Sequence, residues 1–124
     1  MRILVLDDSQ VVRKTLRGTL ERHDHWQVCG EAANGREGIE QAQKLMPDLI
    51  VLDFSMPVMN GVEAARELTR LLPSLPILMF TNYGTDYLHQ EALSAGARAV
   101  LSKSDSVQSL LSTIQSVIKP IATA

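Results

Sequence analysis

Five short apolar runs, separated by stretches with helical periodicity, most constrain how this chain can fold. The runs lie at residues 2–7, 26–31, 48–53, 77–80 and 98–102. Between them, apolar side chains recur every three or four residues, as they do on one face of a helix, and the clearest case runs from Val107 to Ile118. Short strands that alternate with helices form a parallel sheet covered on both faces. The pattern therefore predicts an α/β fold.

Polar residues next to the periodic stretches indicate where helices begin and end. Ser9 can cap the first helix, and either Ser104 or Ser106 can cap the last one. Residues 83–85 are expected to form a loop, and the small-residue tail after Pro120 is expected to fray.

The third run is apolar at every position from Leu49 to Leu52 and then stops at a carboxylate, Asp53. A continuous apolar run of this kind is typical of a strand that is buried on both faces. In an open parallel sheet, ligands bind at the carboxyl ends of the strands. Asp53 is therefore a candidate site residue. The alternative is a carboxylate that caps the strand and faces solvent.

Three other runs also end at polar side chains. Asp7 and Asp8 follow the first run, Thr81 follows the fourth and Lys103 follows the fifth. If the strands are parallel, these side chains meet Asp53 at one edge of the sheet. Three crowded carboxylates repel one another and need a cation among them, and oxygen ligands favour a hard ion such as Mg²⁺. A metal, a lysine and a hydroxyl donor around a carboxylate are the parts that hold a phosphoryl group.

Each of these residues has an ordinary structural explanation when it is taken alone. An Asp-Asp pair at the end of a strand commonly caps the next helix. Thr81 could be a turn residue, and Lys103 could be a solvated charge. The functional interpretation depends on their joint occurrence, each at the end of a different apolar run.

Composition excludes several classes of function. A chain of 124 residues is the size of one domain, and its net charge of −2 gives no basic surface of the kind that nucleic-acid binders carry. The single cysteine, Cys29, excludes an internal disulfide and is expected to be a small buried residue. No stretch approaches the roughly 20 apolar residues of a membrane span, and the N-terminus does not look like a secretory signal. We expect a cytoplasmic protein.

Four motifs resemble those of the receiver domain of bacterial two-component response regulators. They are the acidic pair in LVLDDS, the block LIVLDFSMPVMNG, the threonine in LMFTN and the lysine in GARAVLSK. The resemblance extends over residues 1–124, and the segments VCGEAANGREGIEQA and LSAGARAVLSKSDS are most similar to the NarL/FixJ-type subgroup. It implies a flavodoxin-like (βα)₅ fold, a doubly wound parallel sheet of five strands in the order 2-1-3-4-5.

The resemblance also implies a switch that is controlled by phosphorylation. Asp53 would accept a phosphoryl group from a phosphohistidine on a sensor histidine kinase or phosphotransfer protein. Asp8, Asp53 and the backbone carbonyl of Ser55 would bind Mg²⁺ directly, whereas Asp7 would act mainly through water.

Two further residues would then transmit the change. Lys103 would pair with Asp53 and afterwards with the phosphoryl oxygens. Thr81 would bind the phosphoryl group and relay its presence to the surface formed by the fourth helix, the fifth strand and the fifth helix.

The expected partners follow from the same resemblance. The domain would not be an enzyme in its own right, although it would assist its own phosphorylation and dephosphorylation, and a homodimer could form on phosphorylation. No membrane or nucleic-acid contact is expected of this domain itself. A helix-turn-helix domain beyond Ala124 would bind DNA, so a stand-alone receiver and a fragment of a longer regulator both stay open.

Three residues depart from the family pattern. Val100 stands where the family usually has an aromatic ring that changes rotamer. Ser104 follows Lys103 where proline is frequent and the peptide bond is often cis, and Asn82 replaces a small residue after the threonine.

Two alternative functions remain. The first is a pseudo-receiver that binds partners without phosphorylation, which Val100 and Ser104 favour. The second is a small phosphatase, because DFS superficially resembles the DxD motif of haloacid-dehalogenase hydrolases. Those enzymes need an acid where this chain has Ser55.

Overall fold

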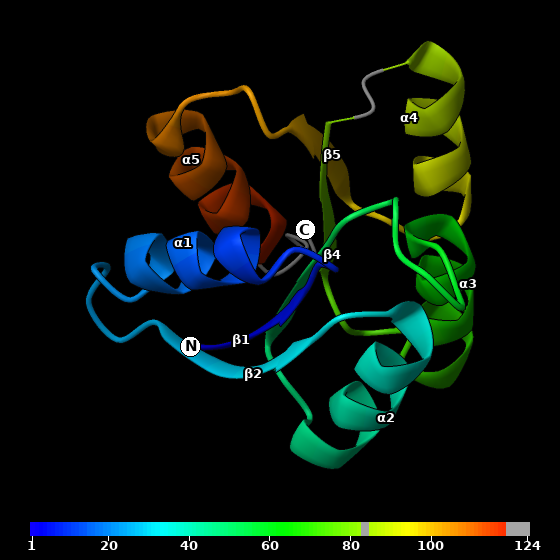
Figure 1. Ribbon diagram of the computed structural model, residues 1–124, viewed down its shortest axis with the longest axis horizontal. Coiled ribbons are helices and arrows are strands. Elements are labelled where there is room, and N and C mark those ends of the chain that lie inside the picture. Colours follow the sequence, from blue (N-terminus) through cyan, green and yellow to red (C-terminus); the bar gives the residue numbers. More distant parts are fainter. Residues whose placement is uncertain (83–84, 119–124) are drawn as a thin grey trace, which may run out of the picture.

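The computed structural model shows strands and helices in strict alternation along the chain (Figure 1). The structure describes residues 1–82 and 85–118. The expected loop at residues 83–85, apart from Thr85, and the expected frayed end after Pro120 lie outside the described residues. The strands are β1 (Arg2–Leu6), β2 (Gln27–Ala32), β3 (Leu49–Leu52), β4 (Ile77–Thr81) and β5 (Ala99–Ser102). The helices are α1 (Gln10–Leu20), α2 (Gly35–Leu45), α3 (Gly61–Leu71), α4 (Asp86–Ser94) and α5 (Val107–Ile118).

All five strands of this part of the chain form one parallel sheet in the order β2-β1-β3-β4-β5. Residues at the carboxyl ends of neighbouring strands pair directly, as Leu6 does with Leu52 and Thr81 with Ser102. The loops that follow β1, β3, β4 and β5 therefore lie at one edge of the sheet. The predicted flavodoxin-like topology is confirmed.

Helices cover both faces of the sheet (Figure 1). Helices α1 and α5 pack against one face, where Ile3 and Val5 of β1 point, and α2, α3 and α4 pack against the face that receives Leu4 and Leu6. In β3, every side chain is at most 1 % exposed. Because neither face of this strand meets water, its sequence is a continuous apolar run without alternation.

Helix starts follow the capping residues that the sequence provides. Ser9 Oγ accepts a hydrogen bond from the backbone N–H of Val12 at 3.2 Å, which confirms the predicted start of α1. At the start of α5, where Ser104 and Ser106 were both candidates, Ser106 Oγ accepts from the N–H of Ser109 at 3.1 Å. None of the described helices is both long enough and apolar enough to span a bilayer.

The expectation that Cys29 is buried was wrong. A β-bulge shifts the pairing between β1 and β2, so that Ile3 lies opposite Val28 and Leu4 lies opposite Gly30. Cys29 is the extra residue of this bulge and is only half-buried. Its partial burial is the main cause of a raised thiol pKa.

Gly61, the first residue of α3, lies against the backbone of the segment that follows β3. Its N–H donates to the carbonyl of Phe54 at 2.8 Å. A Cβ atom at this position would overlap the carbonyl oxygen of Asp53 and would lie 2.8 Å from the Cα of Phe54. The glycine therefore permits the loop 54–60 to close tightly beside Asp53.

We expect Gly61→Ala to lower the free energy of unfolding by about 1–3 kcal/mol, because the added methyl group must displace backbone atoms. Gly18→Ala is the matched control. Gly18 lies inside α1, and no atom outside the helix backbone lies within 4 Å of the place that a Cβ would take, so alanine should stabilise the protein by up to about 1 kcal/mol through helix propensity. Urea unfolding of both variants checks this. Equal effects of the two substitutions would contradict the close approach at Gly61.

Candidate functional site

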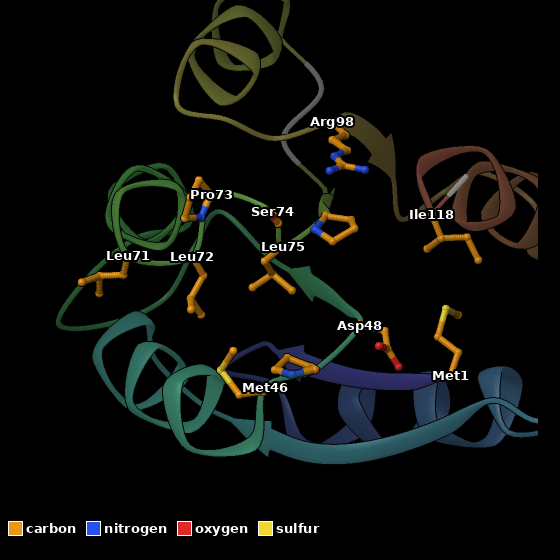
Figure 2. A pocket seen from close by; sticks show the side chains of 12 residues that line it. Met1, Met46, Asp48, Leu71, Leu72, Pro73, Ser74, Leu75, Arg98 and Ile118 are labelled. Carbon is orange, nitrogen blue, oxygen red and sulfur yellow. The ribbon is translucent and has the colours of Figure 1, made fainter. Parts of the chain in front are cut away.

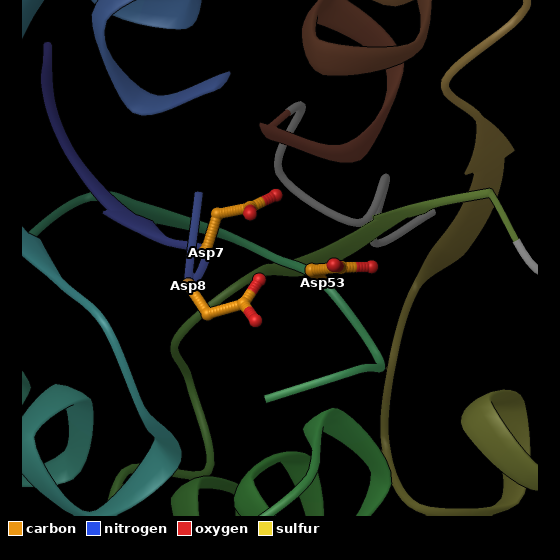
Figure 3. A group of neighbouring side chains, drawn as sticks. All are labelled: Asp7, Asp8 and Asp53. Atoms are coloured by element: carbon orange, nitrogen blue, oxygen red, sulfur yellow. The ribbon is translucent and has the colours of Figure 1, made fainter. Parts of the chain in front are cut away.

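Three carboxylates meet at the carboxyl edge of the sheet (Figure 3). Asp7 and Asp8 follow β1, and Asp53 follows the neighbouring strand β3. Their oxygen atoms offer one ligand each within 4.8 Å of one another. Asp7 is 2 % exposed and Asp53 is 5 % exposed, whereas Asp8 faces solvent. The cluster thus consists of two buried acids and one exposed acid.

The sheet itself fixes the backbone of both buried acids. The N–H of Asp53 donates to the carbonyl of Leu6, and the N–H of Asp7 donates to the carbonyl of Ala32, each at 3.0 Å. These two bonds continue the ladder one residue past the ends of β3 and β1. The positions of the acids are therefore set by strand pairing and not by a free loop.

Lys103 provides the cation for this cluster. Its Nζ lies 2.7 Å from Asp7 Oδ2 and 3.1 Å from Asp53 Oδ2, and its side chain is 12 % exposed. Burial by itself lowers the pKa of Lys103. Hydrogen bonds and the negative charges of Asp7 and Asp53 outweigh that effect and raise the pKa above its ordinary value. The ammonium group therefore stays protonated beside two buried carboxylates.

The second oxygen of each buried acid is held by a nearby backbone N–H. Asp7 Oδ1 accepts from the N–H of Ser9 at 2.9 Å, and Asp53 Oδ1 accepts from the N–H of Phe54 at 2.8 Å. Both carboxylates are thus oriented by one charged donor and one backbone donor.

The other two predicted site residues lie on neighbouring segments. Thr81 is the last residue of β4 and is 1 % exposed, and its carbonyl accepts from the N–H of Lys103 at 2.9 Å. Ser55 is half-buried in the loop two residues after Asp53. The structure therefore brings Asp7, Asp8, Asp53 and Lys103 into one cluster, joins Thr81 to it through the backbone, and places Ser55 beside it along the chain.

All three departures from the family pattern lie among the described residues. Asn82 directly follows Thr81 and is exposed. The described residues contain no cis peptide bond, so the bond between Lys103 and Ser104 is trans. The Ser104 N–H donates to the hydroxyl of Ser102 at 3.2 Å. Val100 is half-buried and packs against the core on the face covered by α2, α3 and α4.

The donor set fits a hard divalent cation. Three carboxylate oxygens lie close enough to share one ion, and the group contains neither histidine nor cysteine, the ligands that zinc prefers. One acid of the three is exposed, which leaves room for water or a phosphoryl oxygen on an ion such as Mg²⁺.

A cavity elsewhere in the molecule contains none of these residues. It has a volume of about 810 Å³ and lies at the amino edge of the sheet, where Met1, Asp48 and Pro76 precede β1, β3 and β4 (Figure 2). At the opposite edge of the sheet, ion pairs join Lys103 to Asp7 and Asp53. Electrostatic contacts, and not empty volume, therefore identify the candidate site.

Arg13 is a neighbour of the acids that the sequence interpretation missed. Its Nη1 donates to the backbone carbonyl of Asp7 at 2.6 Å, and its Nε donates to Glu31 Oε1 at 3.1 Å. A single arginine on an amphipathic helix looks like any solvated charge. Only the fold reveals this contact.

Comparison with known proteins agrees with the geometry. Residues 3–115 match the model of the response regulator receiver domain. A protein-glutamate methylesterase/protein-glutamine glutaminase from Alkalilimnicola ehrlichii is 46 % identical over 105 residues, which are 83 % of this chain and 27 % of that protein. The transcriptional regulatory protein LnrK from Bacillus subtilis is 36 % identical over 117 residues, which are 94 % of this chain and 53 % of LnrK. The chain thus spans about a quarter to a half of the length of these relatives.

Solved structures show the same similarity. The crystal structure of a two-component response regulator of the LuxR family from Aurantimonas sp. SI85-9A1 superposes with a TM-score of 0.91 at 30 % identity. The match covers 94 % of this chain and 84 % of that one. With five parallel strands in the order 2-1-3-4-5 and a matching family model over most of its length, the chain belongs to the receiver domain family of two-component response regulators.

Proposed function

We propose that the chain is a phosphorylation-controlled switch in which Asp53 is the phosphoacceptor. The observation that carries this proposal is the position of Lys103 Nζ between Asp7 and Asp53, at 2.7 and 3.1 Å. An ammonium group that already pairs with the attacking carboxylate can follow the negative charge onto an incoming phosphoryl group. We assign residues 1–124 to one receiver domain.

The proposed reaction is a phosphoryl transfer from a phosphohistidine. A carboxylate oxygen of Asp53 forms a bond to phosphorus, the P–N bond to the imidazole breaks, and its electron pair returns to the ring nitrogen. The product is an acyl phosphate on Asp53. Lys103 would then release Asp53 and bind phosphoryl oxygens, and the hydroxyl of Thr81 would donate to another of these oxygens.

We assign Mg²⁺ as the metal that accompanies the transfer. When bound, this ion neutralises charge that develops on the phosphoryl oxygens. Asp8, Asp53 and the backbone carbonyl of Ser55 would hold it directly. Asp7 would act mainly through water, as the resemblance to the family implies.

We further propose that the output passes through the surface of α4, β5 and α5. Thr81 ends β4 next to β5, where it pairs with Ser102, so a movement of Thr81 would reach β5 directly. Val100 is the half-buried residue that must accommodate this movement in place of an aromatic ring. The relay would therefore act through backbone and packing shifts, without a ring that changes rotamer.

The proposed donor is a sensor histidine kinase or phosphotransfer protein, in the cytoplasm. The domain would catalyse no reaction on a separate substrate. If the chain is part of a longer protein, the output would come from another domain, and the names of the relatives suggest transcriptional regulation or methylesterase activity as that output. A homodimer of phosphorylated receivers is part of the same proposal.

Phosphorylation of Asp53 can be tested with acetyl phosphate and Mg²⁺. We expect intact-mass measurement to show the addition of one phosphoryl group to the native protein and none to Asp53→Asn, which removes the nucleophilic oxygen. Asp86→Asn is the control, because Asp86 is an exposed acid in the first turn of α4. A native protein that remains unmodified would favour the pseudo-receiver, and an adduct on Asp53→Asn would place the phosphoacceptor elsewhere.

Metal binding can be followed by the amide NMR spectrum during a Mg²⁺ titration. We expect shifts around the loops that carry the acids, and a loss of affinity of at least about 10-fold in Asp8→Asn, since even outer residues of metal sites have effects of this size. Asp24→Asn, at an exposed turn, is the control. Trp26 is a poor fluorescent reporter, because it precedes β2 at the opposite edge of the sheet. A native spectrum that does not respond to millimolar Mg²⁺ would refute the metal assignment.

Lys103→Met removes the cation that the buried acids share. We expect a loss of about 3 kcal/mol in the free energy of unfolding at pH 7 without metal, because Asp7 and Asp53 are left unpaired. We also expect Mg²⁺ to stabilise this variant more than it stabilises the native protein. Lys14→Met, at an exposed position of α1, is the control.

The same lysine predicts a pH dependence. Because the folded pKa of Lys103 is raised above its unfolded value of about 10.4, its ion pairs stabilise the protein fully below that pH and are lost as the pH rises through the folded pKa. Urea unfolding at alkaline pH should therefore show a decline in the native protein that Lys103→Met lacks. Identical pH profiles would contradict the paired state of Lys103.

A further inference from the structure

Arg13 connects β2 to the loop that carries two of the three acids, through an ion pair on one side and a hydrogen bond on the other. Arg13 of α1 bonds Glu31 of β2 through Nε at 3.1 Å, and it bonds the backbone carbonyl of Asp7 through Nη1 at 2.6 Å. Its side chain is 17 % exposed. Both ends of the guanidinium are therefore occupied by partners from outside its own helix.

Glu31 is itself held from a second side. Arg17, one turn after Arg13, bonds Glu31 Oε2 through Nε at 2.9 Å and through Nη2 at 2.7 Å. The carboxylate therefore joins two arginines of α1 and is fixed by three donors. Removal of the positive charge of Arg13 would by itself favour a bound cation, so weaker Mg²⁺ binding without Arg13 would be an effect on position.

The carbonyl of Asp7 is the atom through which Arg13 can orient Asp8. The carbonyl oxygen of one residue and the N–H and Cα of the next lie in one rigid peptide plane. A bond from Arg13 to the Asp7 carbonyl therefore sets the direction of the plane that leads to the Cα of Asp8. Asp7 is additionally held by Ala32, Ser9 and Lys103.

Asp8 depends more strongly on this plane than the other acids do. Its side chain is exposed, whereas Asp7 and Asp53 are buried and are each held by Lys103. Only three residues separate the end of β1 from the start of α1. A rotation of the peptide between Asp7 and Asp8 would turn the exposed carboxylate away from the cluster.

We propose that Arg13, anchored by Glu31, is a positioning residue that sets the affinity of the acid cluster for a divalent cation by fixing the peptide that carries Asp8. This inference rests on the proposed function, which assigns a metal to these acids. Arg13 would not touch the metal or the phosphoryl group.

The test compares Mg²⁺ dissociation constants from NMR titration with free energies of unfolding from urea. We expect Arg13→Ala to weaken Mg²⁺ binding by about 10-fold, as loss of an outer residue of a metal site does. Arg17→Ala is the matched control. It also removes an arginine from Glu31, but Arg17 has no bond to the acid-bearing loop, so its affinity for Mg²⁺ should stay within about 2-fold of the native value. Arg13→Lys, which keeps one donor for the Asp7 carbonyl, should recover part of the lost affinity.

Each outcome bears on the inference. A tenfold loss in Arg13→Ala with little change in Arg17→Ala, at similar stabilities, supports positioning. Equal losses in both variants, or native affinity in Arg13→Ala, overturns it while leaving the proposed function intact. If Arg13→Ala does not fold, Glu31→Gln removes the anchor and should weaken binding by about 3-fold, and native affinity there overturns the inference. Absence of Mg²⁺ binding in the native protein refutes both proposals.

Discussion

The ion pairs of Lys103 with Asp7 and Asp53 are the interaction on which the site depends. Two carboxylates that are almost fully buried would be costly without a charged partner. One ammonium group contacts both, at 2.7 and 3.1 Å, and its own pKa is raised as a result. The fold therefore keeps two buried negative charges in place by means of one shared cation.

The parallel sheet supplies the geometry for that interaction. β1, β3, β4 and β5 all end at one edge, so residues that are far apart in the sequence, such as Asp7 and Lys103, become neighbours. Residues of the neighbouring helices then hold the loops at this edge in place. Gly61 permits the loop after Asp53 to pack against its own strand end, and Arg13 ties the loop after β1 to β2. The helices therefore orient the acids as well as covering the sheet.

Much of the fold and of the site could be predicted from sequence. The apolar runs located all five strands to within about a residue or two, and Ser9 marked the start of α1. The polar residues at the run ends placed the acids, Thr81 and Lys103 at one edge. The strand order came from the family resemblance, since periodicity alone does not specify which strands are neighbours. The prediction for Cys29 failed because a bulge is a property of two paired strands.

By itself, the sequence determined the elements and the chemistry of the strand ends, because these depend on side chains a few residues apart. Only the tertiary structure decided which polar atoms meet. The contact of Arg13 with the Asp7 carbonyl, the choice of Ser106 over Ser104 as the cap of α5, and the trans bond after Lys103 belong to this second class. The Arg13 contact depends on how α1 packs against the sheet beside Glu31. The cap and the trans bond depend on the local path of the backbone. The spacing of apolar residues in the sequence specifies neither of these.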